Sequence, residues 1–330
     1  MKKTLVAMAV LAASGAAMAQ SNVTLYGIVD VWVGQTSNTT AAGVKTSLSK
    51  VDSGGLGGSR WGMSGSEDLG GGLKAIFRLE QGFNADDGTD AVSGFNRNAY
   101  VGLEGGFGTV IVGKTWTAMD DVIGASNSGF DSALSATRGV TTVNQGRTST
   151  FTGSYADSPG NTIKYTSPSF GGVSGSASYS LDETAGVKND TVDFSLSYGA
   201  GPVAANVAYQ TRGDFTGTDD LKLTVLNGSY DLGVAKLLAS YGQVKLAAAK
   251  TTEFQIGADF PLSAALTLSV GFAQSKENAA GANEKRTGYS IAAGYSLSKR
   301  TTAYAGYRQA EVKNSSEKDS LVAVGIRHAF

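Results

Sequence analysis

The strongest constraint on the fold is an alternation of apolar and polar side chains that recurs along most of the chain. In residues 173–182 the odd positions are apolar or glycine, and the even positions carry hydroxyl groups up to a final carboxylate. Successive side chains of a β-strand point to opposite faces, so each such segment predicts a strand with one apolar face. The polar face carries Ser, Thr, Gly and Ala more often than the Lys, Glu and Arg that solvate a soluble sheet. We therefore expect strands whose outer face meets lipid and whose inner face meets water.

The N-terminus has the pattern of a secretory signal peptide. Lys2 and Lys3 precede a short apolar segment, and an Ala-Met-Ala triplet stands directly before Gln20, as at a signal cleavage site. The apolar segment is shorter than the ~18 residues that a membrane-spanning helix needs, and no later segment is long and apolar enough. We expect residues 1–19 to be removed. Residues 20–330 should form a closed barrel, because a barrel also pairs every backbone group in lipid.

The composition excludes several classes of function. The 330 residues include 45 Gly and 4 Pro, which suits strands and tight turns, and no Cys, which excludes disulfides and thiol chemistry. The formal charge is −1, and loss of Lys2 and Lys3 makes it −3, so we expect no nucleic-acid partner. His328 is the one histidine, so a Ser-His-Asp triad or a His/Cys metal site has no source of ligands or base elsewhere. We expect no enzyme activity, no cofactor and no metal, since Asp120 and Asp121 lack the further oxygens that Ca²⁺ or Mg²⁺ takes.

The alternating segments number about sixteen, an even count of the kind that bacterial outer-membrane barrels have. Their expected starts are Val23, Ser59, Leu73, Asn96, Thr109, Asn161, Val173, Thr191, Val203, Leu221, Ala235, Thr252, Leu266, Thr287, Thr302 and Ser320. Short joints rich in Gly, Asp and Pro alternate with longer polar joints, as short periplasmic turns and longer external loops do. We expect residues 35–58 and 276–285 to be external loops, with the glycine-rich residues 54–58 as flexible filler.

Aromatic residues mark the short joints and the end of the chain. They are Phe107, Phe170, Tyr198, Tyr230, Phe260, Tyr295 and Phe330. For any one of them, a place in the core of a β-sandwich is the simpler interpretation. As a set they predict an aromatic girdle at one membrane interface.

The alternation stops over residues 117–150. This interval is rich in Ala, Ser, Gly and Thr, and its charged residues are Asp120, Asp121, Asp131, Arg138 and Arg147. A loop of this length without regular structure is usually functional or disordered. We expect it to enter the barrel and narrow a lumen that sixteen strands would otherwise leave wide. A flexible external loop is the alternative.

Several segments resemble the general porins of Gram-negative outer membranes, and the β-proteobacterial branch in particular. They are Ser59-Arg60-Trp61-Gly62, Gly65-Ser66-Glu67-Asp68-Leu69-Gly70, Tyr100-Val101-Gly102-Leu103 and Gly105-Gly106-Phe107-Gly108. The ending, from Val324 to Phe330, is similar to the assembly signal of that branch, whose terminal aromatic residue is read by the barrel-insertion machinery. The resemblance covers the mature chain and implies a homotrimer of sixteen-stranded barrels in the outer membrane, each with its third external loop folded into the pore. The partners that it implies are outer-membrane lipids, the insertion machinery, and small hydrophilic solutes and ions.

Alternation also assigns charged side chains to the lumen. In residues 73–80 the odd positions are apolar and face lipid, so Lys74, Arg78 and Glu80 point inward. A Lys or Arg on the lipid face near mid-membrane would cost about 2–4 kcal/mol, which enforces this assignment at that depth.

The same rule gives the rest of the candidate site. Arg60 and Lys164 face inward because their neighbours in sequence are apolar, and an outward Tyr100 would turn Arg97 inward. The expected pore constriction has a basic wall and an acidic side, formed respectively by Arg60, Lys74, Arg78, Arg97 and Lys164 and by Glu80, Asp120, Asp121 and Asp131.

Opposed charges across a narrow wet gap orient dipolar solutes, and a surplus of one sign biases ion selectivity. We therefore predict a channel for passive diffusion of small hydrophilic solutes and ions, with a mild preference for anions. Two alternatives are a substrate-specific porin and a barrel that acts mainly in adhesion or surface recognition. The few aromatic residues assigned to the lumen, Tyr26, Trp32 and Tyr304, favour general diffusion over a substrate-specific track.

Overall fold

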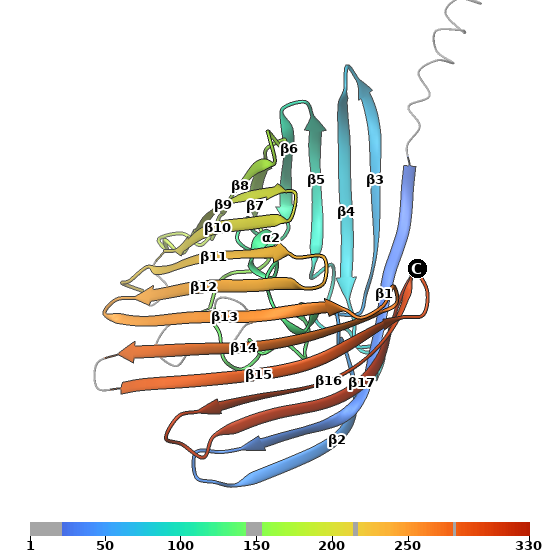
Figure 1. The fold of residues 1–330 in the computed structure, drawn as a ribbon. Coiled ribbons are helices and arrows are strands. Elements are labelled where there is room, and N and C mark those ends of the chain that lie inside the picture. The colour runs from blue at the N-terminus through green and yellow to red at the C-terminus, as the bar shows by residue number, and fades with distance from the viewer. Residues whose placement is uncertain (1–21, 143–153, 214–216, 280–281) are drawn as a thin grey trace, which may run out of the picture.

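The computed structural model describes residues 22–142, 154–213, 217–279 and 282–330, which form one antiparallel sheet that closes on itself (Figure 1). The expected signal peptide, residues 1–19, lies outside the described residues, as do residues 143–150 of the expected pore loop. Among the described residues, no helix is long and apolar enough to cross a membrane.

The strands are β1 (Asn22–Thr39), β2 (Lys45–Ser53), β3 (Arg60–Gly70), β4 (Leu73–Gly82), β5 (Asn98–Gly105), β6 (Gly108–Lys114), β7 (Thr162–Thr166), β8 (Val173–Ser180), β9 (Thr191–Ala200), β10 (Val203–Arg212), β11 (Leu221–Asp231), β12 (Lys236–Leu246), β13 (Ala249–Pro261), β14 (Leu266–Ala279), β15 (Ala282–Ser296), β16 (Thr301–Val312) and β17 (Lys318–Ala329). Two short helical segments, α2 (Asp120–Ile123) and η1 (Gly129–Asp131), lie between β6 and β7.

The segments β2 and β3 are successive parts of one strand of the barrel wall. β1 pairs with β2 along its second half and with β3 along its first half. Its other side pairs with β17, which closes the sheet. With β2 and β3 counted as one strand, the 17 strand segments of the described residues form a barrel of sixteen antiparallel strands. The predicted all-β barrel of about sixteen strands is confirmed.

The expected strand starts agree with the observed ones, with the largest difference at β15, which was expected at Thr287 and begins at Ala282. Two expected loops were wrong. Residues 35–58 contain the end of β1 and all of β2, and most of residues 276–285 belong to β14 and β15. These segments are mostly polar on both faces, and β2 has one large apolar residue on each face, Leu48 and Val51, so the alternation by which a strand is recognised is absent there.

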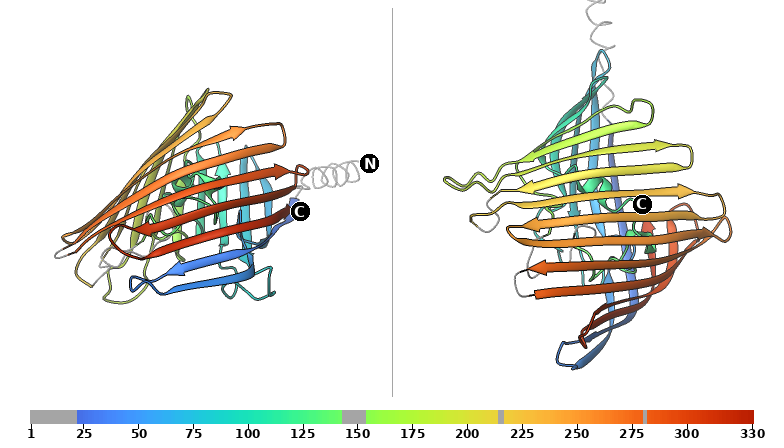
Figure 2. Two further views of the ribbon diagram at one scale, coloured as in Figure 1. Left: turned by 60° about the horizontal axis from the view of Figure 1, so that its bottom comes forward. Right: turned by 60° about the vertical axis from the view of Figure 1, so that its left-hand side comes forward.

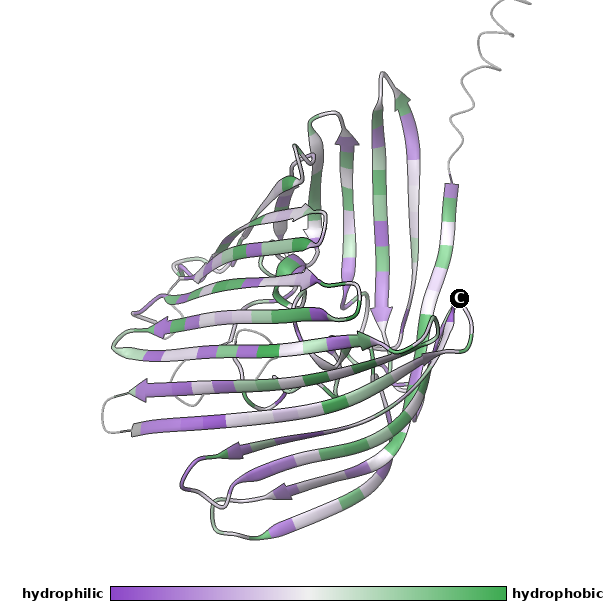
Figure 3. Cartoon of the chain, viewed as in Figure 1, coloured by the Kyte–Doolittle hydropathy of each residue, from purple (hydrophilic) through white to green (hydrophobic). Residues whose placement is uncertain are grey.

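The two faces of the wall differ as the alternation predicts. On β1, Leu25 and Val33 are exposed on the outer face, whereas Asp30 and Trp32 are buried inside the barrel. Figure 3 shows the apolar and polar bands that alternate along the strands. At the tight-turn end of the wall, the exposed aromatic residues include Phe107, Phe170, Tyr198, Tyr230, Tyr295 and Phe330.

The last residue completes the seam between β1 and β17, which run side by side in Figure 2. The Gly27 N–H donates to the Phe330 carbonyl at 3.2 Å, and the Phe330 N–H donates to the Gly27 carbonyl at 3.1 Å. The Phe330 ring covers Gly27 so closely that a Cβ there would overlap it. Glycine therefore leaves the space that the terminal ring fills.

We expect Phe330→Ala to lower the free energy of unfolding by about 1 kcal/mol, because the half-exposed ring loses its packing on Gly27. Urea unfolding of barrels refolded into lipid vesicles measures this without the cellular assembly machinery. The control is Phe170→Ala, since the Phe170 side chain is 71% exposed. Equal losses in both variants would contradict a specific role of the seam.

Candidate functional site: a pore with an inward-folded loop

The segment between β6 and β7 is the third of the long connections between strands. Its described parts lie inside the barrel (Figure 1). We call residues 115–142 and 154–161 the pore loop. The expectation that the chain leaves the wall here and enters the lumen is confirmed.

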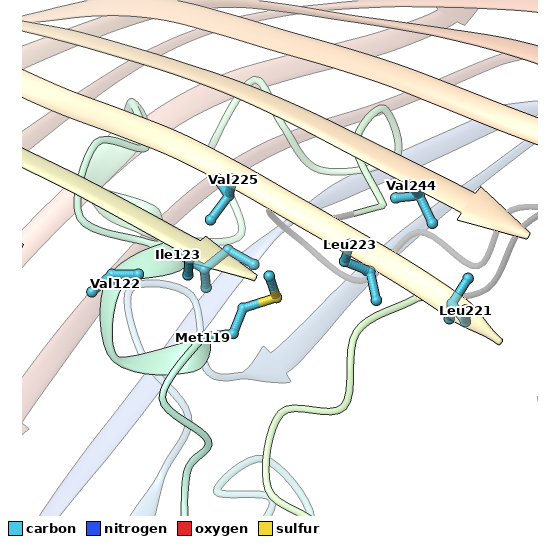
Figure 4. Packing of buried hydrophobic residues seen from close by; sticks show 8 residues of the cluster. Met119, Val122, Ile123, Leu221, Leu223, Val225 and Val244 are labelled. Carbon is cyan, nitrogen blue, oxygen red and sulfur yellow. The ribbon is translucent and has the colours of Figure 1, made fainter. Parts of the chain in front are cut away.

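An apolar cluster attaches the start of the pore loop to the wall. Met119, Val122 and Ile123 of the loop pack against inward side chains of β10, β11 and β12 (Figure 4). Those side chains are Ala208, Leu221, Leu223, Val225 and Val244. Leu221, Leu223 and Val225 thus depart from the rule that apolar residues face lipid, because the loop shields them from the water of the lumen.

Polar side chains of the inner wall bind the backbone of the pore loop. The Met119 N–H donates to Asp193 Oδ1 at 2.9 Å, and the Gly129 N–H donates to Ser269 Oγ at 2.8 Å. Asn227 Nδ2 donates to the Val122 carbonyl at 2.8 Å. The hydroxylic face was expected to meet water. Over much of β8–β14 it meets the loop instead, and this supplies partners for backbone groups that would otherwise be buried without them.

Inward glycines on β13–β16 let the pore loop approach the wall closely. A Cβ at Gly271 would overlap the Ser128 side chain, and one at Gly257 would lie 2.7 Å from Ser128 Cβ. Further along, Leu134 Cδ1 would lie 2.8 Å from a Cβ at Gly306. This glycine track fixes the height at which the loop crosses the lumen.

Lys164 anchors the start of the pore loop. Its Nζ lies 2.6 Å from Asp121 Oδ2 and donates to the Trp116 carbonyl at 2.9 Å. The Lys164 side chain is only 7% exposed. The inward direction of Lys164 agrees with the parity prediction. Its charge is neutralised by the ion pair with Asp121, and the ammonium group also donates to the loop backbone.

The other two loop carboxylates expected at the site, Asp120 and Asp131, have raised pKa values. Burial inside the barrel raises the pKa of Asp120 to about 7, against the opposing hydrogen bond from Tyr155 Oη at 3.0 Å. Asp131 reaches the water of the lumen, yet the surrounding protein lowers its solvation and raises its pKa to about 6. Asn127 Nδ2 donates to Asp131 Oδ1 at 2.8 Å. Near neutral pH Asp120 and Asp131 together therefore carry less negative charge than two fully ionised carboxylates.

Glu80 is the centre of the opposite group of charges. Tyr26 Oη donates to Glu80 Oε2 at 2.8 Å, and Arg97 Nε donates to Glu80 Oε1 at 2.6 Å. Arg60 Nε lies 3.9 Å from the same carboxylate. The Glu80 side chain is 5% exposed. Its buried carboxylate lies between two arginines whose side chains keep about a quarter of their surface exposed.

Two of the guanidinium groups, those of Arg60 and Arg97, pair with this carboxylate, and two more lie close by, Arg327 near Arg60 and Arg78 over the Tyr26 ring. We call the four the arginine cluster: Arg60, Arg78, Arg97 and Arg327. Arg78 lies over the Tyr26 ring at 5.7 Å, and Arg97 lies over the Trp116 ring at 4.8 Å. The sequence analysis did not include Arg327. Parity does indicate its inward direction, because its neighbour in sequence, Ile326, is exposed on the outer face.

A bulge between β2 and β3 supports the arginine cluster. The buried Asp30 carboxylate accepts the N–H groups of Gly55 at 3.2 Å, Leu56 at 2.8 Å and Gly57 at 2.8 Å. The Gly58 carbonyl then accepts Arg60 Nη1 at 3.1 Å. Residues 54–58 were expected to be flexible filler, and this was wrong. They form a nest of N–H groups around a carboxylate that no local sequence pattern connects to them.

Two site expectations need correction in detail. Tyr100 was expected to face lipid, but it lies directly opposite Arg78 and therefore faces the lumen, while Val101 is 61% exposed outside. Arg97 nevertheless points inward, where it donates to Glu80. Arg97 precedes β5, so the alternation along that strand does not set its direction. Lys74 shares the lumen face but lies four residues from Arg78 toward the tight-turn end, paired with Glu104 at 3.7 Å, and not in the cluster.

A second set of charges holds the tip of the pore loop, and sequence reasoning missed most of it. Arg308 Nε on β16 donates to the Ala133 carbonyl at 2.8 Å, and Arg308 also pairs with Asp319 on β17. Arg138 Nε donates to the Ser132 carbonyl at 3.2 Å. Within the described ranges, no three His, Cys, Asp or Glu residues are placed to hold a metal ion.

The family model described as Gram-negative porin matches residues 4–315. The chain belongs to the Gram-negative porin family. It is 34% identical to outer membrane porin protein 32 of Delftia acidovorans and 32% identical to major outer membrane protein P.IB of Neisseria meningitidis serogroup B, each over the full length of both chains. The solved structure of an anion-selective porin from Comamonas acidovorans matches with a TM-score of 0.82 and 27% identity, covering 94% of this chain and 100% of that chain. The predicted resemblance to porins of β-proteobacteria is thereby confirmed, and the protein is a diffusion channel of the outer membrane.

We expect Gly271→Val to disturb the pore loop, because the new side chain occupies the place of Ser128. Single-channel recordings should show a noisy current with several sublevels in place of one steady level. The control is Gly199→Val, since a Cβ at Gly199 meets nothing within 4 Å. A steady native current in the Gly271 variant would contradict docking on the glycine track.

Proposed function

We propose that this porin conducts small hydrophilic solutes and ions passively with a preference for anions, and that the arginine cluster sets the preference. The observation that carries the proposal is the charge balance at the arginine cluster and at the three expected carboxylates of the pore loop. Four guanidinium groups stand against two carboxylates, Glu80 and Asp30, both of which are buried. Of the loop carboxylates, Asp121 is paired with Lys164, and Asp120 and Asp131 have raised pKa values. A surplus of positive charge at a narrow wet passage favours anions.

The similarity to an anion-selective porin from Comamonas acidovorans supports the same sign of selectivity. Two aromatic residues on the lumen side, Trp32 and Tyr304, support general diffusion. Trp32 and Tyr304 are each 4% exposed and pack with Leu134 of the pore loop, so they offer no open aromatic track to a specific substrate.

The remaining features of the proposal concern maturation and assembly. Residues 1–19 are removed as a signal peptide, and residues 20–330 form the mature channel. Three copies assemble in the outer membrane, as one solved relative with 17% identity does in its trimer form. Phe330 serves as the assembly signal in addition to closing the seam. The channel has no catalytic activity and takes no cofactor.

The reversal potential of the native channel in a KCl gradient tests the proposal, and an anion preference is expected. Replacing Arg60 and Arg97 with Gln removes the surplus of two positive charges among the four guanidiniums and two carboxylates. The ratio of chloride to potassium permeability should then fall toward unity. Lys74→Gln is the control, because Lys74 is paired with Glu104 away from the cluster. An unchanged ratio in the double variant would assign selectivity to other residues.

The selectivity should also depend on pH through the pore loop. A carboxyl group with a raised pKa is neutral below that pKa, so lowering the pH through about 7 for Asp120 and about 6 for Asp131 removes negative charge from the lumen. We expect anion preference to increase as the pH falls from about 8 to about 5. The double variant Asp120→Asn, Asp131→Asn should show, at both pH values, the selectivity that the native channel has at pH about 5. The external variant Asp219→Asn should behave as the native channel. A native reversal potential that does not change with pH would refute this account of the loop carboxylates.

A further inference from the structure

The bulge between β2 and β3, residues 54–59, is bonded along most of its length to one residue of β1, Asp30. The Asp30 carbonyl accepts the Gly54 N–H at 2.9 Å and the Ser59 hydroxyl at 3.1 Å. Between these two ends, the Asp30 carboxylate accepts the N–H groups of residues 55–57. Asp30 is fully buried, so this carboxylate acts on a permeating ion only through the residues that it holds.

One side of the bulge holds the tip of the pore loop. The Gly55 carbonyl accepts the Ala133 N–H at 2.9 Å. The Leu56 side chain packs against the apolar cluster that contains Leu134 of the loop. The loop tip is therefore attached to the wall through a segment whose own conformation depends on Asp30.

The other side of the bulge lies against the arginine cluster. The Gly58 carbonyl accepts Arg60 Nη1 at 3.1 Å. A Cβ at Gly58 would lie 3.6 Å from Arg97 Nη1, and one at Gly57 would lie 3.9 Å from Arg327 Nε. Three of the four guanidinium groups thus lie beside this short segment.

We propose that Asp30 is a positioning residue for permeation: by fixing the bulge, it sets the gap between the loop tip and the arginine cluster, and thereby the strength of ion selection. This role rests on the proposed anion preference. Arg60 Nη1 is held by the Gly58 carbonyl while Arg60 Nε stays 3.9 Å from Glu80. Release of the bulge frees Arg60 to pair closely with Glu80 and lets the loop tip move away. Less positive charge then acts on a wider passage.

Position and charge give opposite results when Asp30 is replaced with Asn. Removal of a buried negative charge alone would increase the preference for anions. Loss of the positioning role should decrease it, because an amide offers one acceptor oxygen in place of two and its NH₂ group then meets an N–H of the bulge. We expect Asp30→Asn to lower the ratio of chloride to potassium permeability. Loss of one buried hydrogen bond favours the loosened bulge roughly tenfold, so current sublevels should take a roughly tenfold larger share of single-channel recordings.

The matched control is Asp193→Asn. Asp193 is also a buried carboxylate of the inner wall that accepts a backbone N–H of the pore loop, but it holds Met119 at the start of the loop. The substitution removes the same buried charge and leaves the bulge in place. The permeability ratio at its main current level should therefore be equal to the native ratio or higher.

Ser59→Ala tests the same role without a change of charge. It removes a hydroxyl that accepts the Asp30 N–H at 3.0 Å and donates to the Asp30 carbonyl. The permeability ratio should fall as in Asp30→Asn, but by less. An unchanged or increased ratio in Asp30→Asn overturns the proposal, and if that variant does not fold, an unchanged ratio in Ser59→Ala does so.

Crystal structures of the native channel and of Asp30→Asn separate this role from the proposed anion preference. Residues 54–58, Ala133 and the Arg60 guanidinium should be displaced together in the variant. Native positions of all three would show that Asp30 does not position them, whatever the selectivity of the native channel. Joint displacement in a channel without anion preference would support the positioning role and contradict only the proposed function.

Discussion

The structure depends on the requirement that every backbone N–H and C=O group in the hydrocarbon region is paired within the protein. An open sheet leaves two unpaired edges, so the wall must close, and here β1 and β17 meet along twelve residue pairs from Ile28 to Thr39. The closure continues to the final residue through the paired Gly27 and Phe330. The same requirement applies to the pore loop, which crosses the lumen without a ladder of its own. Its backbone is paired instead by side chains of the inner wall, such as Asp193 and Asn227.

The docking of the loop determines which charges remain for permeating ions. Lys164 and Asp121 neutralise each other while they fix the start of the loop, and Arg308 holds its tip. On the other side, the nest around Asp30 and the hub at Glu80 hold the arginine cluster in place while each uses one buried carboxylate. The carboxylates of Asp121, Asp30 and Glu80 are thus paired in structural contacts of the wall and the loop. Positive charge is left in excess where Arg60 and Arg97 stay partly exposed.

Much of this could be predicted from the sequence, because lipid on one face imposes a strict parity on every strand. Parity gave the strand number and the inward direction of Lys74, Arg78, Glu80 and Lys164, and it would have given Arg327. It was wrong for Tyr100, since an aromatic side chain is compatible with either face and the neighbouring Val101 and Leu103 were the better guide. It could not find β2, because the two apolar residues of that strand, Leu48 and Val51, lie on opposite faces and give no alternation. The contacts of Asp30 with residues 55–57 and of Met119 with Asp193 join segments 25 to 74 positions apart, and only the folded chain brings them together.

The central claim is that loop docking leaves the arginine cluster as the dominant charge facing the water of the pore. Anomalous diffraction from crystals soaked in rubidium bromide tests it most directly, because it locates anions and cations separately in one lumen. The account predicts bromide beside Arg60, Arg97 and Arg327, with no comparable rubidium site at Asp121 or Asp131. Rubidium bound at the pore loop with no bromide at the arginine cluster would contradict it.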